Sequence, residues 1–150
     1  MTKYYSKYAG SAAPGYSPEA LCRFCTPVDF AALRTATGAT GADHTTGVVN
    51  TDDIVVATLP KGSTLISLGL YTETAIGAQT IDLTDGTTTF LSNASGAVAD
   101  TWDYPDTNPM AAVNYGDDTE LYLNADGTIT AGKVWVFGLF YMNVPEASIA

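Results

Sequence analysis

Apolar residues occupy both the odd and the even positions of the segment from Val134 to Val144. On an extended strand, one side would carry Val134, Val136, Phe140 and Met142, and the other side Trp135, Phe137, Leu139 and Tyr141. An antiparallel strand with one face in water would instead alternate apolar and polar residues. The pattern therefore predicts a strand that is either central in a two-sheet sandwich or covered on its outer side by another chain.

Shorter alternating segments precede it and are bounded by Pro-Lys-Gly and Asp-Gly turn signals. In one of them Ile66, Leu68 and Leu70 share the expected inner face. About seven or eight short, evenly spaced strands predict an all-β, antiparallel β-sandwich that is jelly-roll-like. The expected strands before the long one are 54–59, 63–72, 79–83, 87–91, 119–124 and 128–131.

The first third of the chain lacks this alternation. Ser17-Pro18-Glu19 has the residues of a helix start, which predicts a helical turn through Phe24. A second turn is expected to begin at Thr26-Pro27 and to run through Leu33. We therefore divide the chain into an N-terminal arm and connector, residues 1–52, and a β-sandwich body, residues 53–150.

The arm, residues 1–16, combines tyrosines with small residues and lysines. Burying four tyrosines would contribute roughly 20 kcal/mol, and fixing sixteen backbone residues costs a similar amount. Such an arm gains stability on a neighbouring chain that adds apolar surface of its own, although an arm folded back on its own domain is the alternative. The residues of the arm that are expected to bind the neighbouring chain are Tyr4, Tyr5, Tyr8, Tyr16, Lys3 and Lys7.

The net charge of −10 is unevenly distributed. Four basic residues against two acids give +2 up to residue 40, and two against fourteen give −12 beyond it. An acidic body repels phosphate, which argues against nucleic acid and anionic membranes as partners. No segment approaches the roughly 20 apolar residues of a membrane span, and the N-terminus has no signal-peptide pattern, so the chain is expected to stay in the cytoplasm of the cell that produces it.

The residues of common catalytic and metal sites are sparse. His44 is the only histidine, and it lies in a connector of Ala, Thr and Gly that would not orient an imidazole as a base. Cys22 and Cys25 form a single C-x-x-C, whereas a zinc site needs two further ligands. We predict a protein that is not an enzyme, with no catalytic residues, no bound metal and no cofactor.

The segment 92–115 is the longest one without periodicity, and loops of this length are usually functional. Trp102 and Tyr104 could stack on sugar rings, with Asp103 beside them as a polar partner. This loop is the alternative ligand site, for a glycan. A hydrolase based on paired carboxylates, or a Ca²⁺ site, also remains open for its acids.

Three stretches resemble a known family: 57–66 with Leu59-Pro60-Lys61-Gly62, 79–86 with Ile81-Asp82-Leu83, and 133–136. They are similar to small β-sandwich proteins encoded among the head genes of tailed bacteriophages, over about residues 53 to 143. The resemblance implies a head decoration (cement) protein, often a homotrimer, that sits on the capsid lattice and fastens neighbouring subunits. The tyrosine-rich arm has no counterpart in that family.

These lines lead to one functional expectation. The chain is a structural virion protein on the capsid surface, whose partners are the major capsid protein and further copies of itself. The self-interface is expected on the outward side of the long strand, at Trp135, Phe137, Leu139 and Tyr141. The alternative is a phage fibre, spike or tail-associated adhesin that binds glycans.

Overall fold

The computed structural model describes residues 19–33 and 52–143, and these residues form two antiparallel sheets with one short helix. The arm residues Tyr4, Tyr5, Tyr8, Tyr16, Lys3 and Lys7 lie outside the described residues, as do His44 and the connector. The expected all-β sandwich is confirmed. No helix in the described part of the chain is long and apolar enough to cross a membrane.

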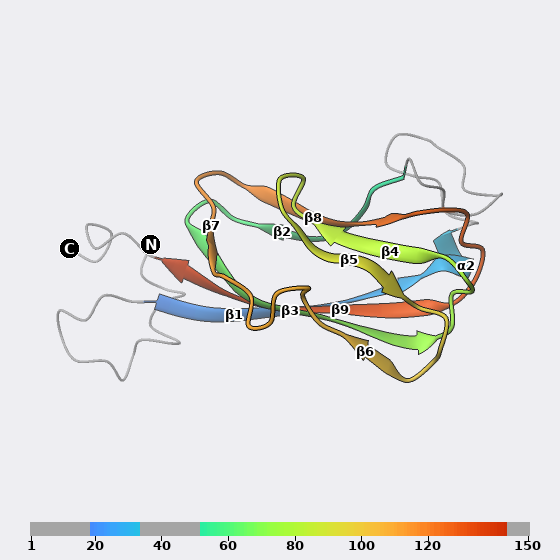
Figure 1. Cartoon of the computed structure of the whole chain (residues 1–150). Helices are drawn as coiled ribbons and strands as arrows, with labels where there is room; N and C mark the ends of the chain where they lie inside the picture. Colours follow the sequence, from blue (N-terminus) through green and yellow to red (C-terminus); the bar gives the residue numbers. More distant parts are fainter. Residues whose placement is uncertain (1–18, 34–51, 144–150) are drawn as a thin grey trace, which may run out of the picture.

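One sheet, the β9 sheet, has the order β1-β9-β3-β6, with β7 also pairing with β3. The other, the β8 sheet, has the order β2-β8-β4-β5, and the two sheets stack as layers (Figure 1). The strands of the β9 sheet are β1 (Glu19–Asp29), β3 (Ser63–Thr74), β6 (Thr101–Asp103), β7 (Val113–Asn114) and β9 (Lys133–Asn143). Those of the β8 sheet are β2 (Ile54–Leu59), β4 (Thr80–Thr84), β5 (Thr89–Ser95) and β8 (Thr119–Ala125).

The strand pairs are nested along the sequence. β1 pairs with β9, β2 with β8, β3 with β6 and β7, and β4 with β5, all antiparallel. This is the order produced when one long hairpin is rolled into two layers, so the fold is a jelly roll. The Asp85-Gly86 turn forms the tip of that hairpin, where the Asp85 carboxylate accepts hydrogen bonds from the backbone N–H groups of Thr87 and Thr88.

The first strand corrects the expectation for the start of the chain. Residues 19–24 do not form a helical turn, because they pair with β9 over a continuous register from Glu19↔Asn143 to Asp29↔Lys133. The second expected turn is helical only in its second half, as α2 (Phe30–Leu33), where the Asp29 carboxylate accepts a hydrogen bond from the Ala32 N–H, while residues 26–29 belong to β1. Residues 19–33 therefore belong to the sandwich, although we expected the body to begin at residue 53.

Two further expectations are wrong. Residues 128–131 contain a single bridge residue, Ile129, and no strand, although the Ile129 side chain is buried as expected. The segment 92–115 is not wholly a loop, because it contains the end of β5 as well as β6 and β7. Both short strands pair with β3, which holds the segment against the β9 sheet.

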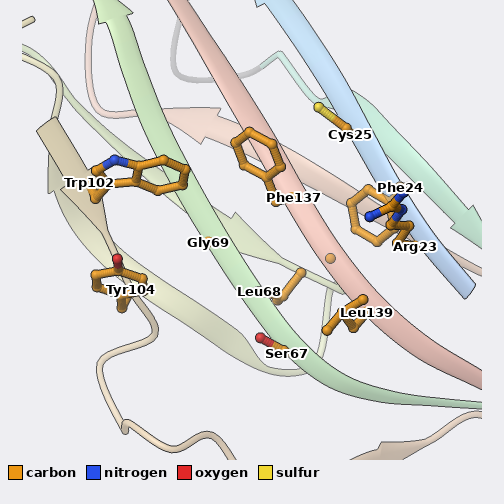
Figure 2. Close-up of a pocket in the computed structure, with 11 residues that line it drawn as sticks. Arg23, Phe24, Cys25, Ser67, Leu68, Gly69, Trp102, Tyr104, Phe137 and Leu139 are labelled. Atoms are coloured by element: carbon orange, nitrogen blue, oxygen red, sulfur yellow. The ribbon is translucent and has the colours of Figure 1, made fainter. Parts of the chain in front are cut away.

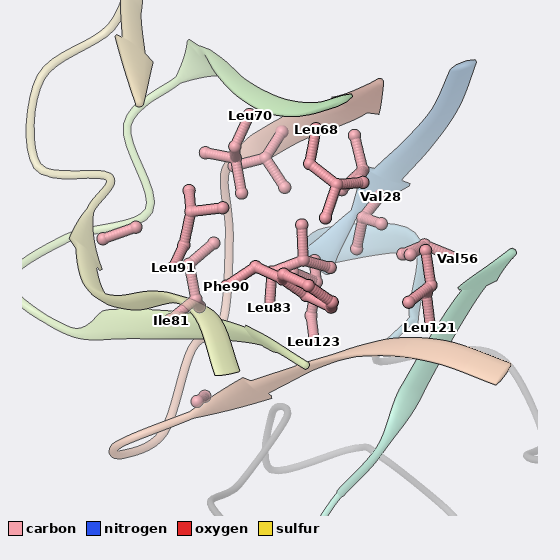
Figure 3. Close-up of a cluster of buried hydrophobic side chains, with 14 of the residues drawn as sticks. Val28, Val56, Leu68, Leu70, Ile81, Leu83, Phe90, Leu91, Leu121 and Leu123 are labelled. Carbon is pink, nitrogen blue, oxygen red and sulfur yellow. The ribbon is translucent and has the colours of Figure 1, made fainter. Parts of the chain in front are cut away.

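The core lies between the two layers (Figure 3). Leu68 and Leu70 point into it as expected, but Ile66 is only half-buried and Leu65 is fully buried in its place. A register shift between Leu65 and Ser67, where β3 pairs with β9, moves the alternation by one residue. The largest fully buried side chains are Phe30, Leu59, Leu65, Leu70, Ile81, Leu83, Leu91, Leu121, Leu123, Ile129 and Val134.

The backbone of Gly132, just before β9, lies close to Phe30 and to the backbone of Ala75 and Ile76. Its carbonyl accepts a hydrogen bond from the Phe30 N–H at 3.0 Å, and its φ of 101° lies in the left-handed region. A Cβ at this position would lie 2.5 Å from the Ala75 carbonyl oxygen and 2.7 Å from the Ile76 Cα. The approach of two backbones therefore depends on the missing side chain.

We expect Gly132→Ala to lower the free energy of unfolding by at least about 2 kcal/mol, because it adds left-handed strain to a clash with backbone atoms. Denaturant unfolding measures this. Gly116→Ala is the matched control, since its Cβ would meet no atom within 4 Å, and it should change stability by less than about 0.5 kcal/mol. Equal stability of the two variants would contradict the close approach at Gly132.

Candidate functional site

The outer face of the β9 sheet is apolar, whereas sheet faces in water are normally polar. Val134 and Val136 point inward and are fully buried, while Trp135, Phe137 and Leu139 on the opposite side are only half-buried. The expected two-sided strand is thus present. Its outer side faces away from the β8 sheet, and nothing else in the described part of the chain forms a third layer over it.

The register places further apolar residues beside these. Tyr141 lies opposite Leu21 of β1, and Phe137 lies opposite Cys25 of β1 and Gly69 of β3. Of the large hydrophobic side chains that are exposed, Leu21 (52%), Trp102 (51%), Tyr104 (57%) and Tyr141 (36%) lie on or beside this face. The exposed apolar surface is therefore concentrated on one side of the molecule.

Four aromatic rings pack together there. Trp102 lies 4.8 Å from Tyr71 and 5.3 Å from Phe137, measured between ring centroids. The rings of Trp102 and Tyr104 are nearly parallel, with an angle of 10° between their planes and 6.4 Å between their centroids. Tyr71 and Trp102 are neighbours because β6 pairs with β3 at these two residues.

Three of these rings, Trp102, Tyr104 and Phe137, border a groove of about 540 Å³ (Figure 2). Trp102 and Tyr104 line one side, Phe137 lies in the middle, and Arg23 and Cys25 lie on the β1 side (Figure 2). The volume lies within the range typical of ligand pockets. We call this the aromatic groove; its outward-facing residues are Arg23, Cys25, Ser67, Gly69, Trp102, Tyr104, Phe137 and Leu139.

The aromatic groove unites two sites that the sequence suggested separately. Phe137 and Leu139 were expected in a self-interface, and Trp102 and Tyr104 in a ligand loop, yet all four line one groove. Trp135 and Tyr141 lie on the same face without lining it. Sequence reasoning missed Arg23 and Cys25 because no strand was expected before residue 54, and missed Gly69 because only the register shows that it lies opposite Phe137.

The acids near the groove are held by structural contacts. The Tyr71 hydroxyl donates to Asp100 Oδ1 at 2.6 Å, which together with burial raises the pKa of Tyr71. Asp106 accepts hydrogen bonds from the Ser92 N–H and hydroxyl. Burial raises the pKa of Asp103. Among the described residues, no group of three or more His, Cys, Asp or Glu side chains is arranged to hold a metal ion.

The outer face of the β8 sheet differs in chemistry. It carries Asp82, Glu120 and Asn124, which alternate with buried residues along β4 and β8. A shallow acidic hollow at its edge is lined by Asp53, Asp85, Asp118 and Glu120. The described residues carry fourteen acids and three bases, a net charge of −11, so a strongly anionic molecule presents one apolar face.

At one end of the apolar face, Trp135 is fixed by charged neighbours. Its Nε1–H donates to Glu73 Oε2 at 2.5 Å, Lys133 Nζ lies 3.3 Å from the same oxygen, and the Lys133 amine lies 5.0 Å from the Trp135 ring centroid. The hydrogen bond from Trp135, followed by the one from Lys133, lowers the pKa of Glu73. The carboxylate therefore orients the indole on the sheet surface.

No protein-family model matches the chain, and no curated protein sequence matches it. Among solved structures, a chain in the capsid of Ralstonia phage GP4 is 15% identical with a TM-score of 0.46, covering 89% of this chain and 90% of that chain. A chain in the acidic stable capsid of Helicobacter pylori bacteriophage KHP30 is 9% identical with a TM-score of 0.45, covering 82% and 92%.

A chain in the virus-like particle of the prawn (Macrobrachium rosenbergii) extra small virus is 11% identical, with a TM-score of 0.34, and the alignment covers 89% of this chain and 86% of that chain. All three of these solved structures are viral particles. At such identities and scores the similarity assigns no role to this chain, so its function has to be argued from its own surface.

The lowered pKa of Glu73 predicts a pH effect on Trp135. The hydrogen bond is fully present above the ordinary glutamic acid pKa, about 4.3, and is lost as the pH falls through the lower, folded-state value. In a Trp102→Phe background, where Trp135 is the only tryptophan, its fluorescence should change in that acidic range. Glu73→Gln should remove the transition and Glu120→Gln should preserve it; a transition that survives Glu73→Gln would contradict the assignment.

Proposed function

We propose that the chain is a structural virion protein, specifically a decoration (cement) protein that binds the outside of a phage capsid and stabilises contacts between neighbouring capsid subunits. The observation that supports this proposal is the difference between the two outer faces: one is aromatic and apolar, the other acidic. Contiguous exposed apolar surface on a soluble domain marks an interaction site.

The architecture supports the proposal by analogy only. Jelly rolls recur in viral capsid and lectin domains, and a fold does not determine a function. The surface argument is independent of this analogy. The anionic face would keep copies soluble and repel phosphate-bearing polymers and membranes, while the apolar face would bind protein.

In this proposal the copies associate, as homotrimers, through Trp135, Phe137, Leu139 and Tyr141 on the outer face of the β9 sheet. The arm residues Tyr4, Tyr5, Tyr8, Tyr16, Lys3 and Lys7 fasten the chain to the shell built by the major capsid protein. Several linked contacts of modest strength give a much higher combined affinity. No catalytic step and no cofactor is part of this role.

The self-association prediction concerns Tyr141, the most exposed of the four proposed interface residues. Tyr141→Glu should shift the chain toward the monomer by at least about tenfold in dissociation constant, because a desolvated carboxylate in an interface is costly. Sedimentation velocity measures this shift. Val55→Glu is the matched control, since Val55 is an exposed apolar residue (47%) of the other sheet and should have no effect. Equal association of both variants and the wild type would remove these residues from the interface.

The shell-binding prediction concerns the arm. Deleting residues 1–16 should abolish attachment to empty phage heads while the circular dichroism spectrum of the body stays that of a folded β-protein. Co-sedimentation with heads measures attachment. A truncated chain that decorates heads as well as the full chain does would exclude the arm from this role.

A second candidate, a glycan-binding adhesin of a fibre, spike or tail, is favoured by one observation. The nearly parallel, half-exposed rings of Trp102 and Tyr104 form a platform of the kind on which sugar rings stack. Asp103 follows Trp102 directly and is half-buried. Binding to a glycan array that disappears in Trp102→Ala and persists in Tyr122→Ala, on the other sheet, would favour this reading over the first.

A further inference from the structure

We propose that the aromatic groove of each copy receives the tyrosine-rich segment, residues 1–18, of a neighbouring copy. This inference rests on the proposed function and refines it: the segment would fasten the layer over the shell by binding the apolar face of a neighbouring copy. The groove offers π-faces on one side through Trp102 and Tyr104, and a further ring, Phe137, in its middle. The segment offers Tyr4, Tyr5, Tyr8 and Tyr16, separated mostly by small residues.

Gly69 lies in the floor of the groove, where its backbone is buried between the neighbouring side chains. This residue lies opposite Phe137 in the register, and a Cβ built on it would meet only the Asp103 carbonyl oxygen, at 4.0 Å. Residue 69 itself therefore adds no side chain to the groove, and a phenol ring entering it would contact the Trp102 and Phe137 rings, whose centroids lie 5.3 Å apart. Ser67, also on β3, adds a hydroxyl at the groove that could pair with a tyrosine hydroxyl.

Charge favours the same occupant. Residues 1–18 contain Lys3 and Lys7 and no acid, whereas the described residues carry a net charge of −11. Asp100 precedes β6 and Asp103 is its last residue, both near Trp102 in the sequence, while Arg23 lines the groove on β1. A cationic segment is therefore attracted on the β6 side of the groove and repelled by Arg23 on its β1 side.

This difference in charge between the two sides of the groove indicates that the bound segment comes from another copy. β1 and β6 are the opposite edges of the four-strand order, and residues 1–18 lead into β1 at Glu19. The chain's own segment would first have to pass Leu21 and Arg23 on β1, where the Arg23 charge repels its lysines. A neighbour's segment can enter over β6, and eighteen extended residues reach up to about 60 Å, several times the width of a four-stranded sheet.

The proposed contact is heterologous, because each copy donates one segment and accepts one. Such contacts form rings when the rotation between copies closes and open chains when it does not. A closed ring of three is consistent with the trimer that we propose. In a layer over a shell, the same exchange would link copies laterally.

The test uses two full-length variants with complementary defects and no capsid. Gly69→Val fills the groove and keeps the segment; replacing all four segment tyrosines by serine disables the segment and keeps the groove. Sedimentation velocity should show that each variant alone self-associates at least tenfold more weakly than the wild type. An equimolar mixture should form a 1:1 heterodimer, since one variant can donate and the other can accept.

Matched controls are Gly116→Val, at an open surface position, and Tyr122→Ser, on the other sheet; both should associate like the wild type. If Gly69→Val does not fold by circular dichroism, Trp102→Ala replaces it as the groove variant. Variants that associate normally would overturn the inference. A mixture that stays monomeric would also overturn it, because the segment would then bind within its own chain.

A neutral oligosaccharide provides a further check on the occupant. If the groove is a sugar site and the segment does not occupy it, the oligosaccharide should bind the wild type and the serine variant equally tightly. Such equal binding would overturn the inference. If the serine variant lost head attachment without any change in self-association, the inference would also be overturned, while the proposed capsid role would remain.

Discussion

The pairing of β1 with β9 is the interaction on which the rest of the structure depends. Eleven consecutive residue pairs, from Glu19↔Asn143 to Asp29↔Lys133, join the first and last described strands without a register shift. This pairing closes the outermost layer of the rolled hairpin and places β9 between β1 and β3. Without β1, the long apolar strand would have an open edge, which is a common route to aggregation.

The central position of β9 explains why both of its sides are apolar. Its inner side fills the core through Val134 and Val136, and its outer side forms the middle of an exposed aromatic face. The face is extended by residues from three other strands that only the register brings together: Cys25, Gly69 and Trp102. One strand thus contributes both to the stability of the domain and to the surface by which we propose that it binds other proteins.

Strands with local signals were predictable from the sequence. β2, β3, β4 and β8 show alternation between turn residues, and β9 is apolar throughout. β1 was mistaken because Ser17-Pro18-Glu19 resembles a helix start, and pairing with β9 outweighs that local preference. β6 and β7 are too short to show a period, and exist because β3 supplies their hydrogen-bond partners. The candidate site was found in two halves, because the distance from Trp102 to Phe137 is set by long-range register and by no local pattern.

The nested order of the strands also has a consequence for biosynthesis. β9 is the last described strand to leave the ribosome, yet it supplies the middle of the adhesive face and is the one described strand that pairs with β1. Pairing over such a separation is slow and late compared with local hairpins. The surface through which we propose that copies adhere is therefore incomplete until β9 has been synthesised, which would delay the association of nascent chains on one polysome.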